Sequence, residues 1–137
     1  EIETIIYDQA NSVNLDGIRA EEVREILSKE VSDELGHSRQ LAERIKELDG
    51  TVEGSMKFKS EQQTSQPPAD TTDLGSVIKG VIDAEKDAIA HYKYIIELTD
   101  GIDFVTQDMC IALQADEEKH LRIFRGFLKG MEKDNLL

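Results

Sequence analysis

The sequence contains a single cysteine, Cys110, two adjacent prolines and no tryptophan among its 137 residues. One cysteine excludes a disulfide within the chain and any four-cysteine zinc or iron site. No apolar run approaches the roughly 20 residues that a membrane-spanning helix needs, and no signal-peptide pattern is present. We therefore expect a cytoplasmic protein that does not enter a membrane.

Basic residues are also scarce, with 16 Lys and Arg against 29 Asp and Glu, and a formal net charge of −13. This balance argues against nucleic acid as a partner, because phosphate contacts need clustered Lys and Arg. Hydrophobic residues make up 39% and charged residues 33% of the chain, which is typical of a globular protein. The length predicts a single domain over residues 1–137.

The apolar residues of the sequence follow a helical period over most of its length. Apolar residues recur every three or four positions in four segments, at about residues 1–14, 19–48, 72–99 and 102–130. The predicted inward stripes include Leu35, Ile45 and Leu48 in the second segment and Val105 in the fourth. The candidate N-caps are Thr71, Thr72 or Asp73 for the third segment and Asp103 for the fourth.

The connections between these segments predict the topology. Short turns join the first segment to the second and the third to the fourth, so each pair forms an antiparallel hairpin. Residues 49–72, which hold both prolines and several Gly, Ser and Thr, form a long crossover loop. The predicted fold is all-α, a four-helix bundle of two hairpins. The first segment is about half as long as the others, so we expect its first turns to precede residue 1.

Charged residues interrupt the inward stripes. Glu34 and His37 lie on the stripe of the second segment, Glu85 on that of the third, and Glu117 and His120 on that of the fourth. Buried carboxylates are costly unless they are paired or bind a metal. A divalent cation inside the bundle satisfies all of them, and a buried salt-bridge network is the alternative.

The spacing of these residues is repeated. Residues 33–37 and 116–120 both read Asp-Glu-x-x-His, which places Glu and His on one helix face. Glu85 lies 32 residues before Glu117, and Glu1 lies 33 residues before Glu34, with Glu3 as a competitor for Glu1. Pairing of the two hairpins brings four Glu and two His together. The predicted metal ligands are Glu1, Glu34, His37, Glu85, Glu117 and His120.

This set resembles the di-iron site of ferritin-like carboxylate proteins, and most closely that of bacterioferritins and of Dps-like proteins with a bacterioferritin-type centre. Residues 105–109, Val-Thr-Gln-Asp-Met, also resemble bacterioferritin. The resemblance implies two iron ions, which manganese or zinc can replace. Glu34 and Glu117 bridge both ions in this scheme, with Glu1 and His37 completing one and Glu85 and His120 the other. It also implies that Asp33 and Asp116 hydrogen-bond ligand histidines of the opposite hairpin.

Some positions depart from these families. Bacterioferritins bind haem through a Met where this chain has Leu35, so no haem is expected. Only 17 residues follow His120, too few for a fifth helix. A dodecamer or a smaller homo-oligomer is therefore expected rather than a 24-subunit cage. Thioferritins carry a cysteine pair near the metals, whereas this chain has Cys110 alone.

The function that the resemblance implies is a ferroxidase, in which O₂ or H₂O₂ oxidises Fe²⁺ for iron storage, detoxification or oxidative-stress defence. One alternative is a di-metal oxidase or oxygenase, with iron or manganese, acting on a small organic substrate. Another is a non-catalytic helical module. Tyr92, two turns after Glu85, is a hydrogen-bond partner of a metal ligand, a redox tyrosine or a core residue. We expect Cys110 in the core, and His91 and Glu118 at the surface.

Overall fold

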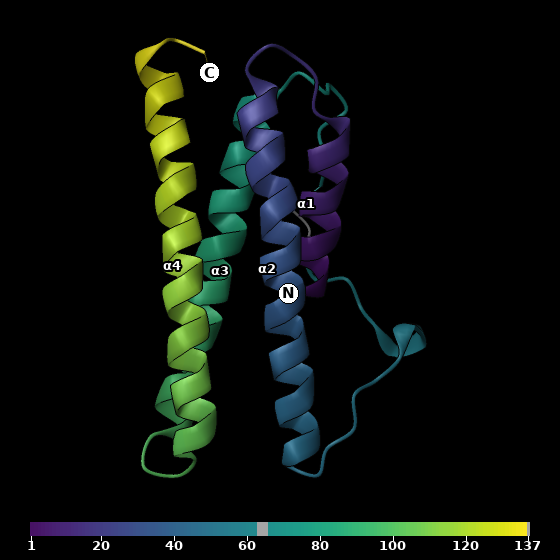
Figure 1. Cartoon of the computed structure of the whole chain (residues 1–137), viewed down its shortest axis with the longest axis vertical. Helices are drawn as coiled ribbons and strands as arrows, with labels where there is room; N and C mark the ends of the chain where they lie inside the picture. Colours follow the sequence, from purple (N-terminus) through teal and green to yellow (C-terminus); the bar gives the residue numbers. More distant parts are fainter. Residues whose placement is uncertain (63–65, 137) are drawn as a thin grey trace. The chain divides into compact units, whose positions relative to one another are not determined.

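The structure is a computed structural model that describes residues 1–62 and 66–136. The chain divides into two compact units, residues 1–67 and 68–137. The described residues form four α-helices and one short 3-10 helix (Figure 1). Each unit contains one helical hairpin, and the prediction that both belong to a single domain over 1–137 stays a prediction.

The first unit is a hairpin of α1 (Ile2–Asn14) and α2 (Ala20–Glu47). The two helices pack side by side and run antiparallel (Figure 1). Gly17 makes the turn between them with a φ of +116°, a value that suits glycine. Arg24 closes the turn, because its Nη1 donates to the carbonyl of Leu15 at 3.3 Å.

The second unit is a hairpin of α3 (Leu74–Thr99) and α4 (Phe104–Lys133). Asp73 caps α3 by accepting from the Ser76 amide at 3.1 Å, and Asp103 caps α4 by accepting from the Thr106 amide at 3.1 Å. The turn is tied by Gln107, whose Nε2 donates to the carbonyl of Ile96 at 3.1 Å and to Asp100 at 3.0 Å. The 105–109 stretch thus fastens the start of α4 to the end of α3.

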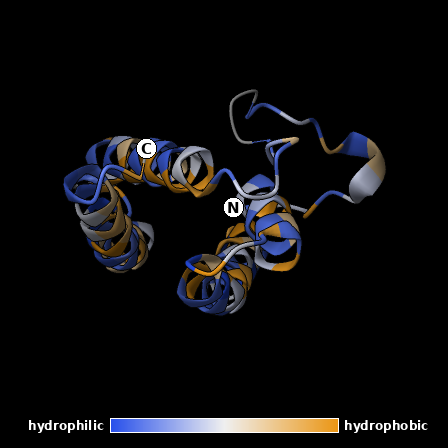
Figure 2. Ribbon diagram, turned by 90° about the horizontal axis from the view of Figure 1, so that it is seen from above, coloured by the Kyte–Doolittle hydropathy of each residue, from blue (hydrophilic) through white to orange (hydrophobic). Residues whose placement is uncertain are grey.

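The four helices are amphipathic, and Figure 2 shows hydrophobic and hydrophilic residues on each of them. In α2 the buried positions recur every three or four residues, the helical period. They are Ala20, Val23, Leu27, Glu30, Glu34 and His37. In the second unit the largest fully buried side chains include Ile78, Leu113 and Phe124. The predicted ligands therefore lie on the same helix faces as the hydrophobic core.

Four residues of the predicted stripes are exposed, and their assignment was wrong. Leu35 is 59% exposed because it follows Glu34 and lies about 100° round the helix from the buried face. Ile45 and Leu48 are exposed because α2, with 28 residues, extends past the 13 residues of α1. Val105 is exposed because the buried stripe of α4 begins at Cys110, in a different phase.

The connection between the hairpins corresponds to the predicted 49–72 loop. It leaves α2 after Glu47, contains the 3-10 helix η1 (Ser55–Lys57) and ends at Leu74. Residues 63–65 of that prediction, like residue 137 of the predicted domain, lie outside the described residues. None of the four helices, over the part of the chain that the structure describes, has an apolar stretch able to cross a membrane.

Candidate metal centre

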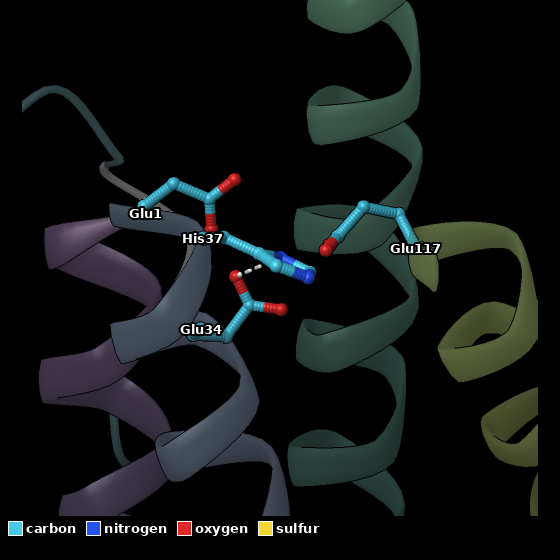
Figure 3. Close-up of side chains that lie close together, drawn as sticks. All are labelled: Glu1, Glu34, His37 and Glu117. Atoms are coloured by element: carbon cyan, nitrogen blue, oxygen red, sulfur yellow. Dashed lines mark ion pairs between the residues drawn. The ribbon is translucent and has the colours of Figure 1, made fainter. Parts of the chain in front are cut away.

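The first hairpin brings three of the predicted ligands together (Figure 3). Glu1 is the N-cap of α1, and Glu34 and His37 are one turn apart on α2. One ligand atom from each of these residues lies within 4.8 Å of the other two. Nδ1 of His37 is 3.5 Å from Oε2 of Glu34. Glu34 is fully buried, His37 is 3% exposed and Glu1 is half-buried, so water reaches this half-site only on the side of Glu1.

The second hairpin repeats the arrangement with Glu85 on α3 and with Glu117 and His120 on α4. One ligand atom from each again lies within 4.8 Å of the other two. Nδ1 of His120 is 3.7 Å from Oε1 of Glu85. Each carboxylate is 1% exposed. The helical phase that placed these residues on the inward stripes is confirmed, whereas the meeting of the two half-sites in one centre stays a prediction.

The charge of the buried residues favours a bound cation. Among the described residues, no Lys or Arg side chain is buried, whereas the carboxylates of five residues are. These are Asp8, Glu30, Glu34, Glu85 and Glu117. Burying a carboxylate without a compensating charge costs several kcal/mol. Two imidazoles do not balance five carboxylates, whereas two divalent cations supply four positive charges, and carboxylate and imidazole are ligands that iron and manganese accept.

Glu3, the competitor of Glu1, has another role in the structure. Its Oε1 accepts from the backbone amides of Glu61 and Gln62, at 2.5 Å and 2.9 Å. Among the groups of residues able to hold a metal, Glu1 is present and Glu3 is not. The geometry therefore favours Glu1 as the α1 ligand, as the repeat predicted.

Two further buried acids were missed by the sequence analysis. Asp8 is fully buried on α1, and Glu30 is 2% exposed on α2. Their spacing could have predicted their burial, because it places each on the helix face of a predicted ligand: Asp8 lies two turns after Glu1, and Glu30 lies one turn before Glu34. The second hairpin has Tyr92 and Leu113 at the corresponding repeat positions. The first hairpin thus buries two acidic residues that have no acidic counterpart in the second hairpin, which a simple duplication does not predict.

Of the remaining residues singled out from the sequence, some are buried and others are exposed. Tyr92 is 3% exposed, on the helix face of Glu85, while Asp33 and Asp116 are half-buried. His91 and Glu118 are exposed, as expected. Cys110 is a buried free thiol, also as expected. Burial, and secondly the charge of Asp103, raise the pKa of Cys110 above its ordinary value, so it is a poor nucleophile.

Known proteins resemble the chain along most of its length. The sequence profile of the ferritin-like domain family matches residues 1–133. No curated protein matches the sequence significantly.

Three solved structures share its fold. A dodecameric thioferritin from Bacteroides fragilis, a bacterioferritin-related protein, has a TM-score of 0.86 at 22% identity, over 98% of this chain and 80% of its own. A ferritin-like diiron-carboxylate protein from Bacillus anthracis has a TM-score of 0.80 at 23% identity, over 93% and 86%. A Dps1 variant from Mycobacterium smegmatis has a TM-score of 0.77 at 19% identity, over 92% and 85%. These likenesses confirm the predicted all-α, ferritin-like four-helix fold.

Proposed function

The chain belongs to the ferritin-like domain family, and from this premise we propose that it is a ferroxidase that binds two Fe²⁺ ions as substrates. The observation that carries the proposal is the repeated half-site of two carboxylates and one imidazole in each hairpin. All six residues are buried except Glu1, which is half-buried, and no Lys or Arg among the described residues is buried. Such a donor set is hard and anionic, and it stabilises Fe³⁺ over Fe²⁺. Manganese and zinc have suitable charge and ligand preferences to replace iron.

The ligand assignment follows the repeat. Glu1 and His37 bind one iron, and Glu85 and His120 bind the other. Glu34 and Glu117 would bridge the two ions if the hairpins pair about an approximate two-fold axis, as the repeat predicts. Asp33 and Asp116, each next to a bridging Glu in the sequence, accept a hydrogen bond from the second ring nitrogen of a ligand histidine in the opposite hairpin. This contact fixes the tautomer and orientation of each imidazole.

The reaction oxidises each Fe²⁺ by one electron. The two electrons released by the iron pair, together with two protons, reduce O₂ to H₂O₂. With H₂O₂, the same two electrons and two protons break the O–O bond and give two molecules of water. The buried carboxylates favour both reactions, because their negative charge stabilises the more highly charged product ion. Water is largely excluded from their surroundings, so these electrostatic effects are strong.

The biological role that we propose is iron storage, detoxification or defence against oxidants, in a homo-oligomer. The B. fragilis protein of the same fold is a dodecamer, which supports an assembly of that kind here. The formal charge of −13 per chain attracts cations to such a particle. No haem takes part in the proposal, since Leu35 offers no haem ligand.

A stopped-flow assay of Fe²⁺ oxidation tests this function. We expect Glu117→Ala to lose most of the rate with either oxidant, because a ligand shared by both ions is removed. Glu118→Ala is the matched control, since Glu118 is the exposed neighbour of Glu117 on the same helix. Equal rates for wild type and Glu117→Ala would end the proposal. A mass in solution of one or two chains would instead favour an oxidase of a small organic substrate.

A further inference from the structure

Glu3 holds the connection between the hairpins onto the first turn of α1. Its Oε1 accepts from two successive backbone amides, those of Glu61 and Gln62. The side chain of Gln62 adds a third contact, because its Nε2 donates to Oγ1 of Thr4 at 3.2 Å. Three hydrogen bonds therefore reach α1 from two adjacent residues of the connection.

Little else attaches this part of the chain to a helix. Residues 51–61 are all exposed, and the most covered apolar side chain among them, that of Phe58, is still 45% exposed. A hollow of about 180 Å³ separates the connection from α1, between Ile6 and Tyr7 on one side and Phe58 and Pro67 on the other. Among the described residues from 51 to 67, the hydrogen bonds to a helix are the three at Glu3 and Thr4. The contact therefore depends on the Glu3 carboxylate rather than on packing.

This attachment lies beside a predicted metal ligand. Glu1 is two residues before Glu3 and one turn before Thr4, on the same helix face as Thr4. Thr4 is buried, and the backbone of the turn is closed by the Ile5 amide, which donates to the carbonyl of Glu1 at 2.9 Å. A restraint on Glu3 and Thr4 thus restrains the turn from which the Glu1 carboxylate extends.

We propose that Glu3 is a positioning residue: by clamping residues 61–62 onto α1, it fixes the turn that presents Glu1 to the metal bound by His37. The inference rests on the proposed function, since it assigns a role toward the same metals. Glu3 does not bind metal in this account. Its carboxylate acts through the backbone amides of the connection.

The second hairpin has no counterpart of the contact between Glu3 and residues 61–62, so it provides an internal control. Glu85 follows Glu1 by 84 residues, so the repeat position of Glu3 is Asp87, which is exposed. Glu85 lies in the middle of α3, with helical turns on both sides. The clamp is therefore specific to the half-site of Glu1, and its loss should affect one metal of the two.

An anaerobic titration with Co²⁺, which has visible absorption bands and is not oxidised under these conditions, tests the clamp. We expect wild type to bind two ions per chain and Glu3→Ala to bind one of them about tenfold more weakly, the effect of leaving one glutamate side chain unrestrained. Glu3→Gln keeps an oxygen that can accept from both amides, so it should behave as wild type. Asp87→Ala, the matched control, should do the same.

Hydrogen exchange of the backbone amides of residues 58–62 gives a second readout. Coupling between two sites is reciprocal, so Co²⁺ should slow exchange of the Glu61 and Gln62 amides in wild type. In Glu3→Ala these amides should exchange faster and should not respond to the metal.

The outcomes separate this inference from the function. A wild type that binds no Co²⁺ refutes the ferroxidase proposal. Two ions bound equally well by wild type and Glu3→Ala would overturn the clamp and leave the function standing. A Glu3→Gln variant as defective as Glu3→Ala would also overturn it, since the charge of Glu3 rather than its acceptor oxygen would then matter. The inference would also be overturned if the amides of residues 58–62 in wild type exchanged at the same rate with and without the metal.

Discussion

Replacing Glu85 by glutamine should change stability in opposite directions without and with metal. Glu85 is 1% exposed, and its Oε1 is 3.7 Å from Nδ1 of His120. Glutamine has nearly the same shape but carries no charge. Without metal, Glu85→Gln removes one of the two buried carboxylates of this half-site, which relieves the repulsion between Glu85 and Glu117 and leaves Glu117 beside His120. With metal, the variant lacks an anionic ligand.

The two effects are large enough to measure. Replacing a whole buried ion pair by well-packed hydrophobic residues of similar volume stabilises proteins by about 1 to 4 kcal/mol in favourable cases. We expect the lower end for Glu85→Gln without metal, because it neutralises one carboxylate and keeps a polar side chain. A site saturated at a hundred times its Kd adds about 2.7 kcal/mol. One kcal/mol shifts the Tm of a chain of this size by about 3 to 4 °C. The apo variant should therefore melt about 3 to 4 °C higher than wild type and lose about 10 °C of the rise that metal gives.

Scanning calorimetry of the apo and Co²⁺-loaded proteins measures both effects. Glu118→Gln is the matched control, because it removes the same charge from an exposed position, and it should leave both melting temperatures within about 1 °C of wild type, as surface substitutions usually do. The opposite result, which would refute this reasoning, would be an apo Glu85→Gln that melts well below wild type but whose Tm rises on addition of Co²⁺ as much as that of wild type. The carboxylate would then be a structural partner and not a ligand.

Three further predictions concern the second hairpin. Phe124→Ala should lower the free energy of unfolding by about 3 to 5 kcal/mol in urea titrations, because Phe124 is fully buried; a loss below about 1 kcal/mol would contradict this. Asp103→Ala should cost about 1 kcal/mol in the same assay, because the N-cap of α4 is lost, while Asp103→Asn should retain most of it. The raised pKa of Cys110 keeps its thiol protonated in the folded state at pH values where the unfolded chain ionises. Stability should therefore fall as the pH rises past the ordinary thiol pKa, and a Cys110→Ala variant with an unchanged pH profile would refute that contribution.

Much of the candidate site could be predicted from the sequence, because a helix converts spacing directly into direction. Glu34, Glu85 and Glu117 were placed on inward faces by their period relative to neighbouring apolar residues, and all three are buried. The repeated Asp-Glu-x-x-His pattern then paired each Glu with its His. Hairpins and N-caps followed from turn residues and from Asp103 in the same local way.

What was missed depends on contacts between distant residues. The repeat favoured Glu1 over Glu3 as a ligand, but the contact that Glu3 makes instead, with the amides of Glu61 and Gln62 some 58 residues away in the sequence, has no local signal. Asp8 was in phase with Glu1, but nothing local shows that α1 is buried so deeply there. Leu35 was misplaced because an apolar residue next to the stripe was counted as part of it, although one position turns a side chain about 100° round the helix.

The central claim is that Glu34 and Glu117 share a pair of iron ions. Crystals loaded anaerobically with Fe²⁺ and measured at the iron absorption edge test it most directly. We predict two anomalous peaks per chain, with the carboxylates of Glu34 and Glu117 between them and one histidine on each. Crystals without such peaks, or with Glu34 and Glu117 too far apart to bind a common ion, would contradict the account.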